Sequence, residues 1–235
     1  MAQSDRLPPV WRALVAAGTF ALLGACSTVA PLRPAPQRMQ AIEANKQAAA
    51  LFERADYAGA VAKYREALML ERAIENEDGI AINLINLSIG YQRLGDRGAA
   101  HAALREMIGS SFVQFPARRI AEAAFRSAVL LLEAEDVPAA ATALVRAREA
   151  CVEPACGLRG RLLNVQAQIA LLDKDFAGAR ALAEQALGIN RQEGEAAEQA
   201  NALRLMGAAL LELEQADAAQ RAVIEALAID KGLAQ

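Results

Sequence analysis

The 235-residue sequence has little of the side-chain chemistry on which many enzymes and metal sites depend. Its only histidine, His101, lies in "AAHAALREM", where we expect the exposed surface of a helix. No second histidine is present to complete a metal site or a nucleophile–base pair. No glycine-rich phosphate loop follows an expected strand. Close acidic pairs, such as Glu133/Glu135 and Glu195/Glu198, fit solvated helix faces better than acid–base pairs. The sequence therefore predicts no enzyme, no cofactor and no metal.

Aromatic residues, prolines in the main part of the chain and long apolar runs are also scarce. Aromatic residues make up 4% of the sequence, and Pro116, Pro138 and Pro154 are the only prolines after Pro36. Alanine is abundant, so the composition is typical of a helical protein. The formal net charge is −3 without a basic block, which gives no electrostatic reason to expect a nucleic-acid partner.

One short apolar run, "ALVAAGTFALL" (13–23), stands near the N-terminus. It is too short for a transmembrane helix, which needs about 20 residues. It follows a weakly basic start with Arg6 and Arg12 and ends in small residues, a pattern typical of a secretory signal. The motif "LGAC", which ends at Cys26, resembles a bacterial lipobox.

The lipobox resemblance implies that residues 1–25 are a lipoprotein signal peptide. It also implies a diacylglycerol group on the Cys26 sulfur and a third acyl chain, such as palmitate, on its new amino group; two or more chains give stable anchoring. Ser27 rather than Asp follows, which in lipoproteins of Gram-negative bacteria favours the outer membrane, here on its periplasmic face. The alternatives are an ordinary signal peptide with a chance cysteine and an uncleaved buried helix.

The segment that follows the cysteine is rich in proline, and we expect residues 26–39 to form a tether. Pro31, Pro34 and Pro36 predict an extended, non-helical spacer. Such a spacer would hold the folded part, residues 40–235, away from the membrane.

Similar segments recur five times in the rest of the chain. Each has a polar start, an alanine four residues later, and apolar or small residues four and seven positions beyond that alanine, which places all three on one helical face. The alanines lie 40, 40, 39 and 40 residues apart. The segments are "DYAGAVAKYREAL" (56–68), "DRGAAHAALREMI" (96–108), "DVPAAATALVRAR" (136–148), "DFAGARALAEQAL" (175–187) and "QADAAQRAVIEAL" (215–227), with Ala60, Ala100, Ala140, Ala179 and Ala219.

An amphipathic segment precedes each of these, most clearly "INLINLSIGYQRLGD" (82–96) and "NALRLMGAALLELEQ" (201–215). The combination resembles the tetratricopeptide repeat (TPR) over about residues 40–231, in a variety with longer helices. The third repeat departs from the pattern, because Ser127 and Ala128 stand where a Leu-Gly pair is common.

The resemblance implies an all-α, TPR-like right-handed α-solenoid of five helical hairpins. Asp56, Asp96, Asp136 and Asp175 are expected to cap the second helix of a hairpin. The alternative is a plain helical bundle or a coiled coil. Helices are predicted at 40–54, 57–75, 79–94, 97–109, 117–134, 137–151, 158–173, 176–190, 195–213 and 217–231.

Two further cysteines, Cys151 and Cys156, flank "VEPA" between the third and fourth hairpins. With Cys26 lipidated they would be the only thiols left, and a periplasmic setting permits a disulfide across so short a turn. A zinc site would need two more ligands, and the nearby sequence offers none.

The resemblance also implies that the first helix of each hairpin lines a groove for peptides or partner proteins. Asn and Arg side chains there could hold an extended peptide by its backbone or its carboxylate, although each could equally be an ordinary exposed residue. The candidates opposite the core are Asn45, Asn86, Gln92, Arg93, Arg126, Asn164, Gln168 and Arg204.

These patterns favour a membrane-anchored scaffold that binds proteins of the cell envelope, similar in layout to repeat lipoproteins of pilus, secretin, outer-membrane insertion or cell-wall machinery. The alternative is a structural lipoprotein that associates with itself. The last segment favours this second option, because no following repeat would cover Val223, Ala226, Leu227 and Ile229.

Overall fold

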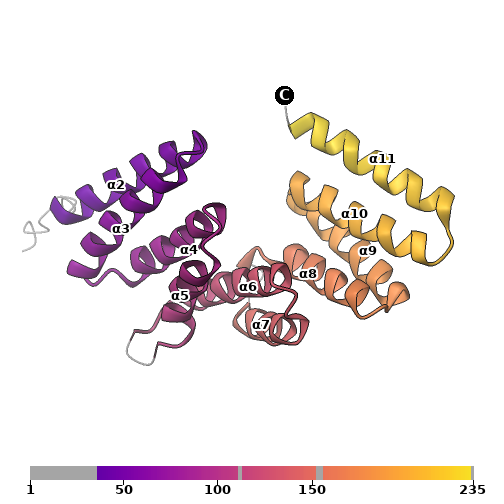
Figure 1. Cartoon of the computed structure of the whole chain (residues 1–235), viewed down its shortest axis with the longest axis horizontal. Coiled ribbons are helices and arrows are strands. Elements are labelled where there is room, and N and C mark those ends of the chain that lie inside the picture. The colour runs from indigo at the N-terminus through magenta and orange to yellow at the C-terminus, as the bar shows by residue number, and fades with distance from the viewer. Residues whose placement is uncertain (1–35, 111–112, 152–155, 234–235) are drawn as a thin grey trace, which may run out of the picture. The chain divides into compact units, whose positions relative to one another are not determined.

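A computed structural model describes residues 36–110, 113–151 and 156–233 of the chain. The predicted signal peptide, the lipidation site Cys26 and residues 26–35 of the predicted tether lie outside the described residues. The described part folds into helices that pair in chain order as five antiparallel hairpins (Figure 1). The pairs are α2 (Pro36–Glu53) with α3 (Tyr57–Ala73), α4 (Glu77–Arg93) with α5 (Arg97–Ile108), α6 (Ala117–Glu133) with α7 (Val137–Ala150), α8 (Arg159–Leu172) with α9 (Phe176–Glu193), and α10 (Ala196–Glu212) with α11 (Ala216–Leu233).

Each predicted helix is present, and the ends agree to within a few residues. The largest difference is at α2, which begins at Pro36 instead of residue 40. Residues 36–39 therefore belong to the first helix and not to the predicted tether. Proline is accepted in the first turn of a helix, because the N–H group that it lacks has no intrahelical partner there.

The turn inside each hairpin has the same conformation in all five repeats. The residue just before the polar residue that starts the second helix has a positive φ, in the left-handed region. The N–H group of that polar residue then donates a hydrogen bond to the carbonyl five residues earlier, as Asp56 does to Leu51 at 2.9 Å. Only one of these five positions is a glycine, so the turn is not evident from glycine content. The five residues are Ala55, Gly95, Glu135, Lys174 and Glu214.

The residue after this turn begins the second helix. Asp56 accepts a hydrogen bond from the Gly59 N–H group at 2.9 Å, so the same residue closes one helix through its backbone and caps the next through its side chain. The other three predicted caps are confirmed in the same way, at Asp96, Asp136 and Asp175.

The repeated alanines lie where helices cross. Ala60, Ala100, Ala140 and Ala179 are fully buried and Ala219 is 1% exposed. A small side chain at a crossing lets two helices approach closely. The second helix of each hairpin also packs against the first helix of the next, so the core continues from hairpin to hairpin. Among the described residues, no helix has the length and hydropathy needed to cross a membrane.

Candidate functional site

The first helices of the hairpins follow one another along one side of the repeat. Within the described residues, α4 contacts α6, α6 contacts α8, and α8 contacts α10. Polar side chains join α4 to α6 and α8 to α10, and a groove lies between α2 and α4. This side of the molecule is where the sequence predicted a binding surface.

The α2–α4 groove has a volume of about 530 Å³. Residues at helical spacing along α2 form one wall, residues of α4 form the other, and α3 contributes to the lining. The α2 wall consists of Arg38, Ile42, Asn45, Lys46 and Ala49. The rest of the lining consists of Tyr64, Glu71, Asn76, Asp78, Gly79, Ile82 and Asn86.

Two of the predicted binding residues, Asn45 and Asn86, both line this groove. Asn45 Oδ1 is buried and has no hydrogen-bond partner among the described residues. Several other buried side-chain atoms of the described residues also lack a partner, among them Asn164 Oδ1, but Asn45 is the one of these residues that lines the groove. Its presence in an open groove fits a position that a ligand would complete.

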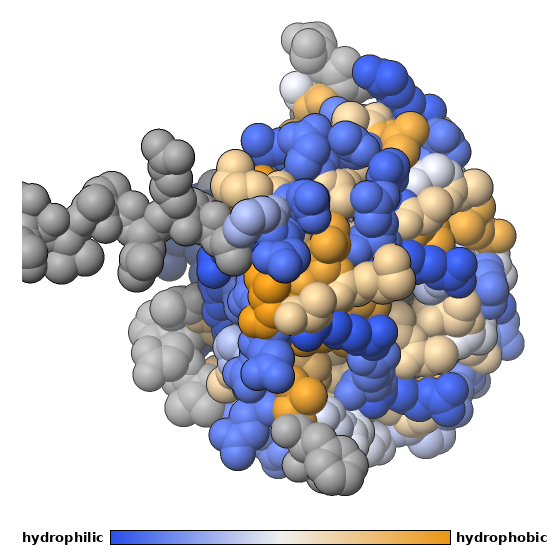
Figure 2. All heavy atoms as spheres, turned by 90° about the vertical axis from the view of Figure 1, so that its left-hand side faces the viewer, coloured by the Kyte–Doolittle hydropathy of each residue, from blue (hydrophilic) through white to orange (hydrophobic). Residues whose placement is uncertain are grey.

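The groove also carries positive charge that sequence reasoning did not select. Arg38 and Lys46 lie on the groove side of α2, are exposed, and form no ion pair with the described residues. Their positions relative to Asn45 were visible in the sequence, since Arg38 lies two helical turns before it and Lys46 follows it directly. Figure 2, seen from the side of α2 and α3, shows apolar residues gathered among hydrophilic ones. The exposed large apolar side chains of these two helices are Met39, Ile42 and Met69.

Acidic groups at the α4 end of the groove already have partners. Glu71 is buried and accepts a hydrogen bond from Asn76 Nδ2 at 2.7 Å. Asp78 pairs with Arg119 of α6, whose Nε lies 2.7 Å from Oδ1, and this hydrogen bond lowers the pKa of Asp78. Burial raises the pKa of Tyr64 and keeps its hydroxyl neutral. Among the described residues, Arg38 and Lys46 are therefore the charged groups of the groove that have neither an ion pair nor a side-chain hydrogen bond.

Gln92 and Arg126, two other predicted residues, are joined to each other. Arg126 Nη2 donates to Gln92 Oε1 at 2.8 Å, and Gln92 Nε2 donates to Glu133 Oε1 at 2.5 Å. Burial lowers the pKa of Arg126, and repulsion from Arg161 adds to the effect. These contacts hold α4 against α6, so the two side chains serve packing between repeats.

Asn164 corrects the prediction of an exposed binding residue. It is 1% exposed, and its Nδ2 donates to the Glu198 carbonyl at 3.1 Å and to Glu198 Oε2 at 3.0 Å. Glu198 lies on α10, so Asn164 joins α8 to α10. The sequence missed this because the partner comes from the next hairpin.

The remaining predicted residues are separate from the groove. Arg93 and Gln168 lie on α4 and α8, and both are exposed. Arg204 of α10 pairs with Asp230 of α11 at 2.8 Å, with both side chains about half exposed. Of the predicted residues, Asn45 and Asn86 are thus the two that line the α2–α4 groove.

His101 is partly buried, which corrects the expectation of an exposed side chain. Burial, followed by the nearby Arg105 charge, lowers the pKa of His101 and favours the neutral imidazole at pH 7. In the described ranges, no group of three or more His, Cys, Asp or Glu residues could hold a metal ion.

Cys151 and Cys156 are joined by a disulfide in the structure, with their Cα atoms 5.5 Å apart. The bond links the end of α7 to the segment that leads into α8.

The last helix, α11, has an uncovered apolar face, as the sequence indicated, but the residues exposed on it differ in part from those predicted. Val223 and Leu227 are 38% and 53% exposed, and Ile224 is 57% exposed beside them. Ala226 is buried and Ile229 packs partly against the core, which corrects their expected exposure. The residues equivalent to Val223 in the earlier hairpins, Tyr64, Leu104, Leu144 and Ala183, are all buried.

Comparison with solved structures identifies the fold. The chain is similar to the crystal structure of BtubC (BKLC) from P. vanneervenii, with a TM-score of 0.62 and 16% identity, over 85% of this chain and 92% of that one. It is also similar to two crystal structures of a Podosopora anserina protein described as a putative kinesin light chain with nearly identical TPR-like repeats. The first, a variant with one substitution, has a TM-score of 0.60 and 14% identity, over 84% of this chain and 97% of that one. The second has a TM-score of 0.59 and 14% identity, over 86% and 99%.

These similarities, together with the five hairpins, show that the fold is a TPR-like α-solenoid, as the sequence predicted. No family model matches the sequence. No curated protein matches it closely enough to count as a relative.

Proposed function

We propose that this protein is a non-enzymatic scaffold that binds an extended segment of a partner protein in the α2–α4 groove. The observation that carries the proposal is the buried Oδ1 atom of Asn45, which has no hydrogen-bond partner among the described residues and belongs to a residue that lines an open groove together with Asn86. Asparagine side chains can donate to and accept from a peptide backbone, so two of them can hold a strand without reading its side chains.

The charge of the groove suggests which segments it prefers. Arg38 and Lys46 stand on the same wall as Asn45 and have no acidic partner among the described residues. A carboxylate of the partner, from a side chain or a chain terminus, would supply that partner. Ile42 and Ile82 offer apolar surface to a neighbouring side chain.

The proposed setting is the periplasmic face of the outer membrane, with the chain anchored through acyl groups on Cys26. This part of the proposal rests on the lipobox-like "LGAC" and the uncharged run before it. A tethered repeat domain would collect components of an envelope assembly, such as pilus, secretin, outer-membrane insertion or cell-wall machinery.

Site-specific photo-crosslinking in cells tests the groove. A photoreactive residue at Ile42 or Asn86 should capture one partner protein, which mass spectrometry would identify, and Asn45→Ala should weaken that capture. The matched control places the same photoreactive residue at position 97, because Arg97 is exposed on α5 and does not line the groove. Equal capture from Arg97 and from the groove positions would reject the α2–α4 groove as the binding site.

A second candidate is self-association, which the exposed Val223, Ile224 and Leu227 favour. In each earlier hairpin, the first helix of the following hairpin covers the equivalent face of the second helix. A second copy of the chain could cover this face of α11 in the same way.

A further inference from the structure

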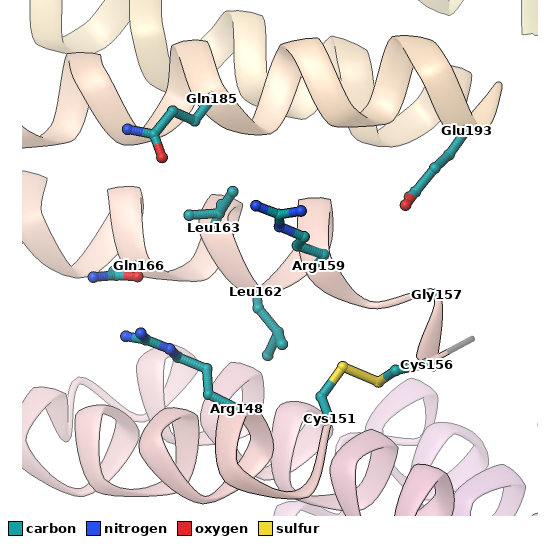
Figure 3. A pocket seen from close by; sticks show the side chains of 10 residues that line it. All are labelled: Arg148, Cys151, Cys156, Gly157, Arg159, Leu162, Leu163, Gln166, Gln185 and Glu193. Carbon is teal, nitrogen blue, oxygen red and sulfur yellow. A yellow bond between two sulfur atoms is a disulfide. The ribbon is translucent and has the colours of Figure 1, made fainter. Parts of the chain in front are cut away.

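A second cavity lies far along the chain from the α2–α4 groove, on α7, α8 and α9 (Figure 3). Its volume of about 580 Å³ falls in the range of pockets that hold small molecules. Arg159, Leu162, Leu163 and Gln166 line it at the spacing of one face of α8, and the Cys151–Cys156 disulfide forms part of its wall.

The cavity is lined by two arginines that form no ion pair with acidic groups of the described residues. Arg148 extends from α7 toward Gln166, and Arg159 extends from α8 toward Leu163 (Figure 3). Neither guanidinium forms an ion pair with the described residues, although the carboxylate of Glu193 also lines the cavity. Guanidinium groups bind carboxylate and phosphate oxygens in preference to neutral groups. The leucines beside them supply apolar surface.

The disulfide ties the two arginines together. Cys151 comes three residues after Arg148, and Cys156 comes three residues before Arg159. The bond brings the Cα atoms of the two cysteines within 5.5 Å, so it fixes the end of α7 against the start of α8. The backbone positions from which Arg148 and Arg159 extend are therefore constrained by a covalent link.

We propose that this cavity is a binding site for a small amphipathic oxyanion, a phosphate ester or carboxylate with an apolar body. The arginines would hold the oxyanion, and Leu162 and Leu163 would contact the apolar part. The disulfide would pre-organise the site. This inference is independent of the proposed function, because it uses other helices and another kind of ligand.

Isothermal titration calorimetry on the full chain tests the site with benzyl phosphate and phenylacetate as probes. At least one of them should bind at least about tenfold more tightly than both benzyl alcohol, which lacks the charge, and inorganic phosphate, which lacks the apolar body. Inorganic phosphate or benzyl alcohol binding as tightly as the tighter of the two probes, or no binding of either probe, would overturn the proposal.

Variants locate the binding. Arg148→Gln and Arg159→Gln should each weaken it about threefold to fivefold, the effect expected of an ion pair at an exposed position. Arg97→Gln removes an exposed arginine of α5, outside the cavity, and should leave binding unchanged. Equal effects of all three substitutions would show that the chain binds anions through its general charge, and the proposed site would be wrong.

The role of the disulfide has its own test. The Cys151→Ser variant should bind the probe at least about threefold more weakly, because the helix ends that carry the two arginines are no longer held together. Circular dichroism should show unchanged helix content, since the disulfide lies between helices. Unchanged affinity in this variant would overturn the role of the disulfide as an organising element.

Discussion

Arg119 on α6 donates a hydrogen bond from Nε to Oδ1 of Asp78 on α4 across 2.7 Å, and this pair joins two successive hairpins. The hydrogen bond is the main cause of the lowered pKa of Asp78, and it raises the pKa of Arg119 in return. Asp78 also lines the α2–α4 groove. The wall of the groove is thus fixed by a contact with the next repeat.

Replacing Asp78 by Asn should destabilise the fold at neutral pH but not in acid. The carboxyl has a lower pKa in the folded chain than in the unfolded one, so its contribution is present above the unfolded value of about 3.9 and disappears as the pH falls through the folded value. Because the side chain is 41% exposed, we expect a loss of only about 0.5–1 kcal/mol. Urea unfolding of both proteins at pH 7 and in acid would measure it.

Lys63→Gln is a suitable control for this experiment, because Lys63 pairs with Glu66 within one helix and joins no hairpins. Its effect should stay within about 0.5 kcal/mol. If the gap between wild type and Asp78→Asn were as large in acid as at pH 7, the ionic contact would not be its cause.

Asn45 and Asn164 should respond in different ways to replacement by alanine. Asn164 is buried and holds Glu198 through two hydrogen bonds, so Asn164→Ala should lower the free energy of unfolding by about 1–3 kcal/mol. The Asn45 side chain forms no hydrogen bond with the described residues, so Asn45→Ala should change stability by less than about 0.5 kcal/mol. Urea unfolding distinguishes the two, and a large loss at Asn45 would mean that it serves folding instead of binding.

A larger side chain at a repeated alanine should disturb the crossing of two helices. Ala60 is fully buried, so Ala60→Leu should cost about 1–3 kcal/mol through overpacking. Ala58 is exposed on the same helix, and Ala58→Leu is the matched control with an expected change near zero. Thermal unfolding followed by circular dichroism would compare them. Similar melting temperatures for both variants would contradict the close approach of helices at Ala60.

The parts of the fold that the sequence revealed are those repeated within it. Ala60 and its four equivalents recur about every 40 residues, and four of the five repeats have an aspartate at the cap position, so the helix pairs could be placed directly. The left-handed turn residues escaped notice, because Ala55 and Lys174 have side chains unlike the glycine that usually marks this conformation.

The candidate site was predicted only in part, because exposure depends on residues of the next hairpin. Asn164 and Asn45 looked equivalent, but only Asn164 meets Glu198, which lies 34 residues further on. The same separation joins Gln92 to Arg126 and Arg72 to Glu106. Pairs of polar residues 34 apart are thus a signal that could have identified contacts between repeats.

The membrane anchor proposed at Cys26 predicts a simple chemical result. Cells fed an alkyne-labelled palmitate should incorporate the label into the wild-type chain and not into Cys26→Ala. The variant should either leave the membrane or stay held by its uncleaved signal, with unchanged helix content. Cys151→Ser serves as the control, since it removes a different thiol and should keep the label. Label retained by Cys26→Ala would contradict the lipobox interpretation.

The uncovered face of α11 predicts how the chain would associate with itself. Val223 and Leu227 are exposed, whereas the residues equivalent to Val223 in the earlier hairpins are buried. Contact with a second copy of the chain at this face would therefore remove apolar surface from water. If self-association occurs, the mass measured by light scattering should rise with concentration. The double variant Val223→Ser with Leu227→Ser should then remain a monomer. Its stability should change little, because half-exposed side chains contribute less than buried ones.

Met69→Ser, at an exposed apolar residue of α3, is the matched control and should associate like the wild type. A wild-type chain that stays monomeric at every concentration would leave the face of α11 to the partner protein instead.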